Sequence, residues 1–256
     1  MSASSPLVYR VPQDSVLGSV LFKLYSQPLS DVISAHGCDF RKYADDTELS
    51  QSAPPDEFSS VQTGNQTCID DVLSWTNSNN LMLNTDKTEV MAVDTSSRLS
   101  RVGRDSANIE GSNVPFKTSV KYLGVKIDQT LSMQDQMSSV CRSFFLKLRR
   151  LASIKPYLSE RTGARLVAAS ITSRLDYRNS VLAGLPAEQI CRLQRVQNSA
   201  ARLVLKKQNR DHITPLLNEL HLLPVKHRCE YKIATLAYCH FDGTLPSYFS
   251  SFSLHL

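Results

Sequence analysis

The hydrophobic pattern of this 256-residue chain changes character about halfway along its length. In the first half, helical spacing of apolar residues is mixed with short alternating runs, and alternation at every second residue is typical of a half-buried strand. From about residue 131 onward, apolar residues recur almost only with the 3.6-residue period of a helix. The sequence therefore predicts an α+β fold, with a mixed part over residues 1–128 and a helical part over residues 129–256.

Individual segments follow from these periods and from loop-forming residues. Loops are predicted at residues 51–57, with paired prolines, and 153–159, and a loop around weak strands at 94–113. A hairpin is expected at 38–50, strands are expected at 90–93 and 120–127, and helices are expected at 15–35, 58–80, 131–153, 159–172, 187–206 and 225–240.

The helix expected at residues 187–206 has a clear two-sided pattern. One side carries the apolar residues Ile190, Leu193, Val196, Ala200, Leu203 and Val204, and roughly the opposite side carries Arg192, Arg195, Arg202 and Lys206. A row of guanidinium groups suits contact with phosphates, although most basic helix faces are merely solvated.

Charge is distributed unevenly between the two halves. Residues 1–140 carry 11 Lys+Arg against 17 Asp+Glu, a balance of −6, whereas residues 141–256 carry 18 against 7, a balance of +11. This asymmetry suggests an acidic part that could hold a metal and a basic part that meets a polyanion. A solvated basic surface is the alternative.

The composition favours an intracellular protein, nuclear or cytoplasmic and not secreted. No apolar run is long enough to span a bilayer, and the N-terminus does not resemble a secretory signal. The six cysteines lie far apart without a CxxC pair, so we expect free thiols. A zinc site would have to use ligands whose spacing matches no common pattern, namely His221, His227, Cys229, Cys239 and His240.

Two adjacent aspartates lie at the centre of the predicted hairpin, in Tyr43-Ala44-Asp45-Asp46. Carboxylates presented by a tight turn bind hard cations such as Mg²⁺. Two such cations clamp the attacking and leaving oxygens in nucleotidyl transfer. Aspartate also favours turns for its own hydrogen bonds, so the tetrapeptide alone leaves both interpretations open.

An ordered series of motifs accompanies this tetrapeptide. It comprises Val11–Gly18, Trp75, Asn80–Asn84, Lys87–Glu89, Tyr122–Val125, Ser173–Tyr177, Gly184–Pro186, Leu193–Asn198, Leu220–Val225 and Tyr231–Ile233. The order and spacing of these motifs resemble those of the reverse transcriptases of LINE-type (non-LTR) retrotransposons. The resemblance covers about residues 8–250 and begins at the second conserved block of the family's palm.

This resemblance implies an incomplete reverse-transcriptase palm, an antiparallel hairpin with packing helices, followed by a helical thumb and C-terminal region. It implies an RNA template and a DNA primer, or an RNA–DNA duplex, as partners and Mg²⁺ or Mn²⁺ as cofactor. The implied site residues are Asp45 and Asp46 for catalysis and metal binding, Lys87 as a catalytic acid, Gln13, Ser15 and Tyr43 for the nucleotide and template, and Leu123 and Gly124 for the primer grip. The alternatives are a surface lysine at Lys87 and ordinary strand and turn residues at Leu123 and Gly124.

Departures from the family pattern point to lost activity. The family's third carboxylate comes from a block upstream of Val11, and the ten residues before Val11 contain no Asp or Glu. We therefore expect weak metal binding and no polymerisation by this chain alone. Asp14, Ser19, Lys42 and Arg178 replace a usual glycine, proline, uncharged residue and cysteine, which suggests drift after catalytic constraint was lost.

Two other interpretations remain at this stage. The chain could be a non-catalytic basic module that binds RNA or DNA, as the +11 balance of the second half suggests. It could also be an unstable product in which unpaired sheet edges are exposed and promote aggregation.

Overall fold

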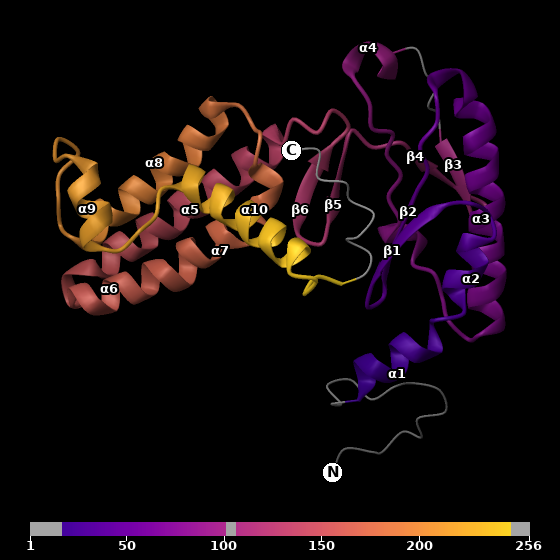
Figure 1. The fold of residues 1–256 in the computed structure, drawn as a ribbon, viewed down its shortest axis with the longest axis horizontal. Helices are drawn as coiled ribbons and strands as arrows, with labels where there is room; N and C mark the ends of the chain where they lie inside the picture. The colour runs from indigo at the N-terminus through magenta and orange to yellow at the C-terminus, as the bar shows by residue number, and fades with distance from the viewer. Residues whose placement is uncertain (1–16, 101–105, 247–256) are drawn as a thin grey trace. The chain divides into compact units, whose positions relative to one another are not determined.

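The computed structural model describes residues 17–100 and 106–246, and the fold is α+β as predicted. The chain divides into two compact units, Met1–Val120 and Lys121–Leu256. Antiparallel hairpins and helices make up the first unit, and helices dominate the second (Figure 1). No helix among the described residues is both long and apolar enough to cross a membrane.

Helix α3 (Phe58–Ser78) runs along one side of the first unit (Figure 1). Helix α2 (Leu29–Ser34) and the hairpin of β1 (Asp39–Tyr43) and β2 (Asp46–Ser50) pack with it. Their shared core consists of Leu29, Ile33, Cys38, Cys68 and Val72, with Phe40, Leu49 and Trp75 half-buried beside it. The predicted helix at 58–80 and hairpin at 38–50 are both confirmed.

A second hairpin, β3 (Ser106–Ile109) and β4 (Ser112–Pro115), packs on α3 through Leu73, Ile109 and Val114. The Gln66 side chain of α3 donates to the Asn108 carbonyl at 2.5 Å and accepts from the Asn108 N–H at 3.2 Å. These two bonds satisfy backbone groups on β3 as a neighbouring strand would. They hold the hairpin against the helix.

Two sequence expectations for this unit were wrong in detail. The helix expected at 15–35 is divided into α1 (Gly18–Tyr25) and α2 by a turn that ends at Pro28, a residue without an N–H for a helical bond. The strand expected at 90–93 is a single bridge between Val90 and Phe116. The unit also contains the short helical segments η1 (Pro55–Glu57), η2 (Thr85–Lys87) and α4 (Ser96–Leu99).

The strand expected at 120–127 is a hairpin of β5 (Ser119–Tyr122) and β6 (Val125–Asp128), because the chain reverses at Leu123 and Gly124. Helix α5 (Gln134–Ile154) follows it. Asp128 organises the connection by accepting hydrogen bonds from the N–H groups of Thr130, Ser132 and Met133. Burial raises the pKa of Asp128, but these hydrogen bonds outweigh it and hold the pKa below its ordinary value.

The remaining elements of the second unit are helical. They are η3 (Lys155–Tyr157), α6 (Glu160–Val167), the π-helical turn η4 (Ala168–Thr172), α7 (Ser173–Asp176), η5 (Asn179–Leu182), α8 (Ala187–Val204), α9 (Ile213–Glu219) and α10 (Val225–Phe241). Their common core includes Phe144, Ile171, Leu193 and Val196. The predicted apolar stripe of α8 is confirmed, since Leu193, Val196, Ala200 and Val204 are all buried.

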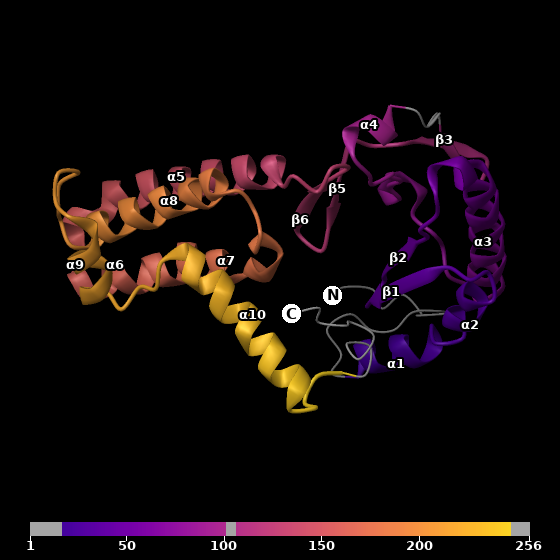
Figure 2. The same ribbon diagram turned by 45° about the horizontal axis from the view of Figure 1, so that its top comes forward.

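Helices α5 and α8 run side by side in the same direction (Figure 2). Near their N-termini, Gln189 donates to the Ser132 carbonyl and Arg192 donates to the Ser138 hydroxyl. Near their C-termini, Leu151 and Val204 line one small cavity. This pair positions the basic residues of α8 discussed below.

Candidate functional site

The two aspartates lie at the tip of the β1–β2 hairpin. Ala44 and Asp45 form the two-residue loop, and Asp46 begins β2 opposite Tyr43. Because side chains alternate between the two faces of a strand, Tyr43 and Asp46 lie on the same face. Glu48 and Arg41, the next pair on that face, are also opposite each other.

The other face of the hairpin anchors it to the first unit. Phe40 lies opposite Leu49, and both pack against the core around Ile33 and Cys68. Lys42, on the same face, donates a hydrogen bond to the Ser26 carbonyl, and burial lowers the pKa of this lysine. The aspartate tip therefore projects from an anchored hairpin.

The environment of the aspartates is suitable for a cation. Asp45 and Asp46 are exposed, and neither carboxylate makes a hydrogen bond or an ion pair within residues 17–100 and 106–246. Their four oxygens are thus available to a hard cation such as Mg²⁺, whose remaining ligands would be water or substrate oxygens. The described residues bring no group of three His, Cys, Asp or Glu side chains together around a possible metal.

Ala44 has a φ of 54°, in the left-handed region that disfavours residues with a Cβ. The change Ala44→Gly is therefore expected to raise the free energy of unfolding by about 0.5–1 kcal/mol. Thermal denaturation of the full chain measures this. Ala35→Gly is the matched control, because Ala35 has a φ of −61° and loses stability on the same change. Equal destabilisation by both changes would rule out strain at the tip.

Three other predicted site residues lie apart from this tip or outside the described structure. Lys87 is exposed in η2, and its N–H bonds to the Asn84 side chain within its own turn at 3.2 Å. No contact joins it to the aspartates within the described ranges. Gln13 and Ser15 lie outside the described residues.

Leu123 and Gly124 form the two-residue turn between β5 and β6. Both have positive φ, 43° and 85°, as the favoured type I′ hairpin turn requires. The Tyr177 hydroxyl donates to the Leu123 carbonyl at 2.9 Å, and the Arg178 guanidinium donates to the Tyr122 carbonyl at 3.3 Å. The sequence alone gave no signal for these two contacts, because they join segments about 55 residues apart.

The basic residues of α8 differ in how accessible they are. Arg195 is exposed, and Lys206, just after the helix, is exposed as well. Arg192 is half-buried and donates to the Ser138 hydroxyl at 3.1 Å. Arg202 is half-buried and donates to the Asp211 carbonyl at 3.2 Å. Of these four, only Arg195 and Lys206 have side chains without a bonded partner in the described part of the chain.

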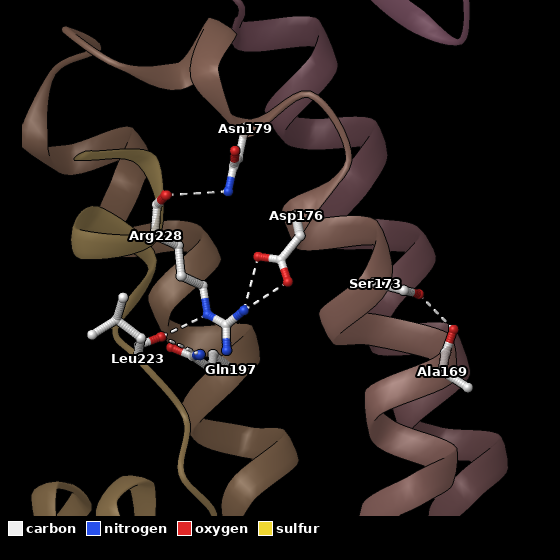
Figure 3. A network of polar contacts seen from close by, with 7 residues as sticks. All are labelled: Ala169, Ser173, Asp176, Asn179, Gln197, Leu223 and Arg228. Carbon is white, nitrogen blue, oxygen red and sulfur yellow. Dashed lines mark hydrogen bonds and ion pairs between the residues drawn. The ribbon is translucent and has the colours of Figure 1, made fainter. Parts of the chain in front are cut away.

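A polar network, here called the Arg228 network, joins Arg228 to three of the motifs of the second half, Ser173–Tyr177, Leu193–Asn198 and Leu220–Val225 (Figure 3). Arg228 contacts both carboxylate oxygens of Asp176, at 2.8 and 2.7 Å, and its Nε donates to the Leu223 carbonyl at 2.7 Å. The buried Gln197 of α8 donates to the same carbonyl at 2.9 Å. The sequence did not predict this network, because the contacts join segments far apart in the chain and Arg228 lies outside the motifs.

Comparison with known protein families gives a match for the first part of the chain. Residues 3–127 match the family model described as reverse transcriptase (RNA-dependent DNA polymerase). The match includes the whole β1–β2 hairpin with its two aspartates, and it ends within β6. No curated protein and no solved structure matches the chain. Residues 3–127 are therefore a domain of the reverse transcriptase family.

Proposed function

We propose that the chain is a palm and thumb portion of a LINE-type retrotransposon reverse transcriptase, related to enzymes that transfer nucleotides onto a DNA primer along an RNA template. The observation that carries this proposal is the free Asp45–Asp46 pair at a hairpin tip inside the matched residues 3–127. The LINE type is supported by the ordered motifs, which continue into the second unit beyond the match.

In this proposal Asp45 and Asp46 hold Mg²⁺ or Mn²⁺. A bound pair of such ions supplies charge stabilisation to the attacking and leaving oxygens of nucleotidyl transfer. Tyr43 shares the face of Asp46 and is 65% exposed, so its ring is available to a nucleotide. Lys87 as a proton donor and Leu123–Gly124 as the primer grip complete the proposed assignments.

The same geometry supports weak activity at most for the isolated chain. Two adjacent residues at the tip carry carboxylates, and no third possible ligand is grouped with them within the described residues. Fewer charged ligands lower the affinity for a hard cation. We therefore propose that this polypeptide, by itself, does not extend a primer at a measurable rate.

Metal binding is the direct test of the aspartate assignment. Titration with Mn²⁺, followed by its electron paramagnetic resonance signal, is expected to show weak binding that Asp45→Asn abolishes. Asp39→Asn is the matched control, since Asp39 is an exposed aspartate at the other end of β1. Binding that survives Asp45→Asn and Asp46→Asn would contradict the proposed site.

Primer extension on an RNA template tests the proposed inactivity separately. No incorporation is expected with Mg²⁺ or Mn²⁺ for the 256-residue chain. Robust incorporation that Asp45→Asn removes would refute inactivity while supporting the catalytic role of the aspartates. The inactivity of the isolated chain is thus tested separately from metal binding by the two aspartates.

A second function, binding of nucleic acid without catalysis, is favoured by the second half of the chain. The balance of +11 over residues 141–256 and the exposed Arg195 and Lys206 would suit the phosphates of an RNA–DNA duplex. This function and the polymerase ancestry are compatible, because a thumb follows the duplex backbone.

A further inference from the structure

The turn of Leu123 and Gly124 is held in a conformation that its own sequence favours only in part. Both residues have positive φ, which glycine adopts freely and leucine does not. Asn-Gly is the pair that prefers this turn, and Leu-Gly departs from it at the first position. A contact from outside the turn therefore stabilises Leu123 in this conformation.

Two consecutive residues at the end of α7 supply that contact. Tyr177 bonds to the Leu123 carbonyl at 2.9 Å and Arg178 to the Tyr122 carbonyl at 3.3 Å. The Tyr177 ring also lies against Gly124, since a Cβ built there would be 3.8 Å from the ring edge. The Arg178 guanidinium lies 4.9 Å from the centre of the Tyr177 ring, which is cation–π range.

Tyr177 and Arg178, here called the clamp, follow residues that are themselves held in place. The Tyr177 N–H closes the last turn of α7 on Ser173, and the preceding Asp176 is fixed by both contacts with Arg228 (Figure 3). The Tyr177 side chain is 57% exposed, so burial does not explain its orientation toward the turn. The hydroxyl bond to the turn is its specific interaction.

We infer that Tyr177 and Arg178 are positioning residues, which hold the Leu123–Gly124 turn in the shape that meets the primer strand. The inference rests on the proposed function, because it takes this turn to be the primer grip. Leu123 and Gly124 are among the last residues of the matched reverse transcriptase domain, whereas Tyr177 and Arg178 lie beyond the match. Residues of the helical region would thus shape a turn of that domain.

The test compares variants of the full chain that lose one hydroxyl each. Tyr177→Phe keeps the ring against Gly124 and removes the bond to Leu123. It is expected to weaken binding of an RNA–DNA duplex with a recessed primer end by about threefold to tenfold. Tyr157→Phe is the matched control, since Tyr157 is 89% exposed and its hydroxyl has no partner in the described residues. It should leave the affinity unchanged.

A second measurement separates positioning from general stability. Labelling of the nine glycines with ¹⁵N should show the Gly124 resonance shifted in Tyr177→Phe and unchanged in Tyr157→Phe. Arg178→Met should also weaken binding more than Arg174→Met, which removes a charge from the neighbouring helix α7.

The outcomes distinguish the inference from the function on which it rests. If the wild-type chain binds the duplex and Tyr177→Phe binds equally well, the inference alone is wrong. A loss of affinity without a shift of the Gly124 resonance likewise overturns positioning, because the turn then keeps its shape. If the wild-type chain binds no duplex at low salt, the proposed function fails and the inference fails with it.

Discussion

The affinity of the chain for an RNA–DNA duplex is expected to fall about tenfold between about 50 and 200 mM salt. The expectation takes the exposed Arg195 and Lys206 as two phosphate contacts, because Arg192 and Arg202 are half-buried and bonded within the second unit. Each neutralised phosphate releases condensed counterions, at roughly −0.9 per contact in a plot of log affinity against log salt. Two contacts therefore give a slope of about −1.8. Fluorescence anisotropy with a labelled duplex measures the slope directly.

Charge-neutral variants test which cations contribute. Arg195→Gln with Lys206→Gln removes the two exposed cations and should bring the slope close to zero. Arg98→Gln with Lys117→Gln is the matched control, because these cations of the first unit are paired with Asp94 and Glu89. That control should leave the slope unchanged.

Two results would contradict this expectation. An affinity that does not change with salt would mean that phosphates are not the partners of the basic face. An equal loss from both pairs of changes would mean that only the net charge matters, and not the position of the cations on α8.

The hairpin with the aspartates could be predicted because its signals are local. Alternation places Phe40 and Leu49 on one face, and the turn-forming aspartates mark the reversal between them. The long helices were predictable for a similar reason: α3, α5, α8 and α10 each carry a continuous helical period. The apolar stripe of α8 was found in this way.

Errors arose where one residue changes the course of the chain. Pro28 separates α1 from α2, and the Leu123–Gly124 turn reverses what reads as a single β-branched strand. The turn was hidden because leucine at positive φ depends on the contacts from Tyr177 and Arg178. The hydrophobic periodicity of a sequence cannot predict a backbone conformation that is stabilised by a side chain far away in the chain.

The same limit applied to the site. Lys42 and Arg178 read as signs of drift in the sequence, yet each donates to a backbone carbonyl, of Ser26 and Tyr122 respectively. Arg192 and Arg202 read as a free basic row, yet both are half-buried and bonded within the second unit. Side-chain partners of this kind become visible only in three dimensions.

Arg228→Met is expected to lower the free energy of unfolding of the helical unit by about 2–4 kcal/mol. The Arg228 side chain is 14% exposed and that of Asp176 is 44% exposed, so the pair is partly shielded from water. Removing the guanidinium leaves the Asp176 carboxylate without its bidentate partner and ends one bond to the Leu223 carbonyl. A half-exposed carboxylate keeps some hydration, which places the loss below the upper end seen for fully buried pairs.

Urea unfolding followed by circular dichroism measures this loss, and Lys226→Met is the matched control on the same helix. Lys226 also forms an ion pair, with Glu230 at 3.7 Å, but both side chains are more than half exposed. Its change should therefore alter stability by at most about 0.5 kcal/mol. A double-mutant cycle with Asp176→Asn isolates the Arg228–Asp176 coupling from the other effects of each change.

Hydrogen exchange would show where the lost stability resides. Helix α10 buries only Val225 and Cys229 along its 17 residues, so apolar packing holds it weakly and the Arg228 network holds its first turns. Arg228→Met should accelerate amide exchange in α10 well before α5, whose Phe144 and Met137 lie in the main core. Equal acceleration in both helices would indicate that the network supports the whole bundle, and an unchanged α10 would indicate that the network contributes nothing to its attachment. Asp176 directly precedes Tyr177, so the loss of its contacts with Arg228 should also loosen the contacts of Tyr177 and Arg178 with the β5–β6 turn. We therefore expect Arg228→Met to lower the affinity for the duplex as well as the stability of α10.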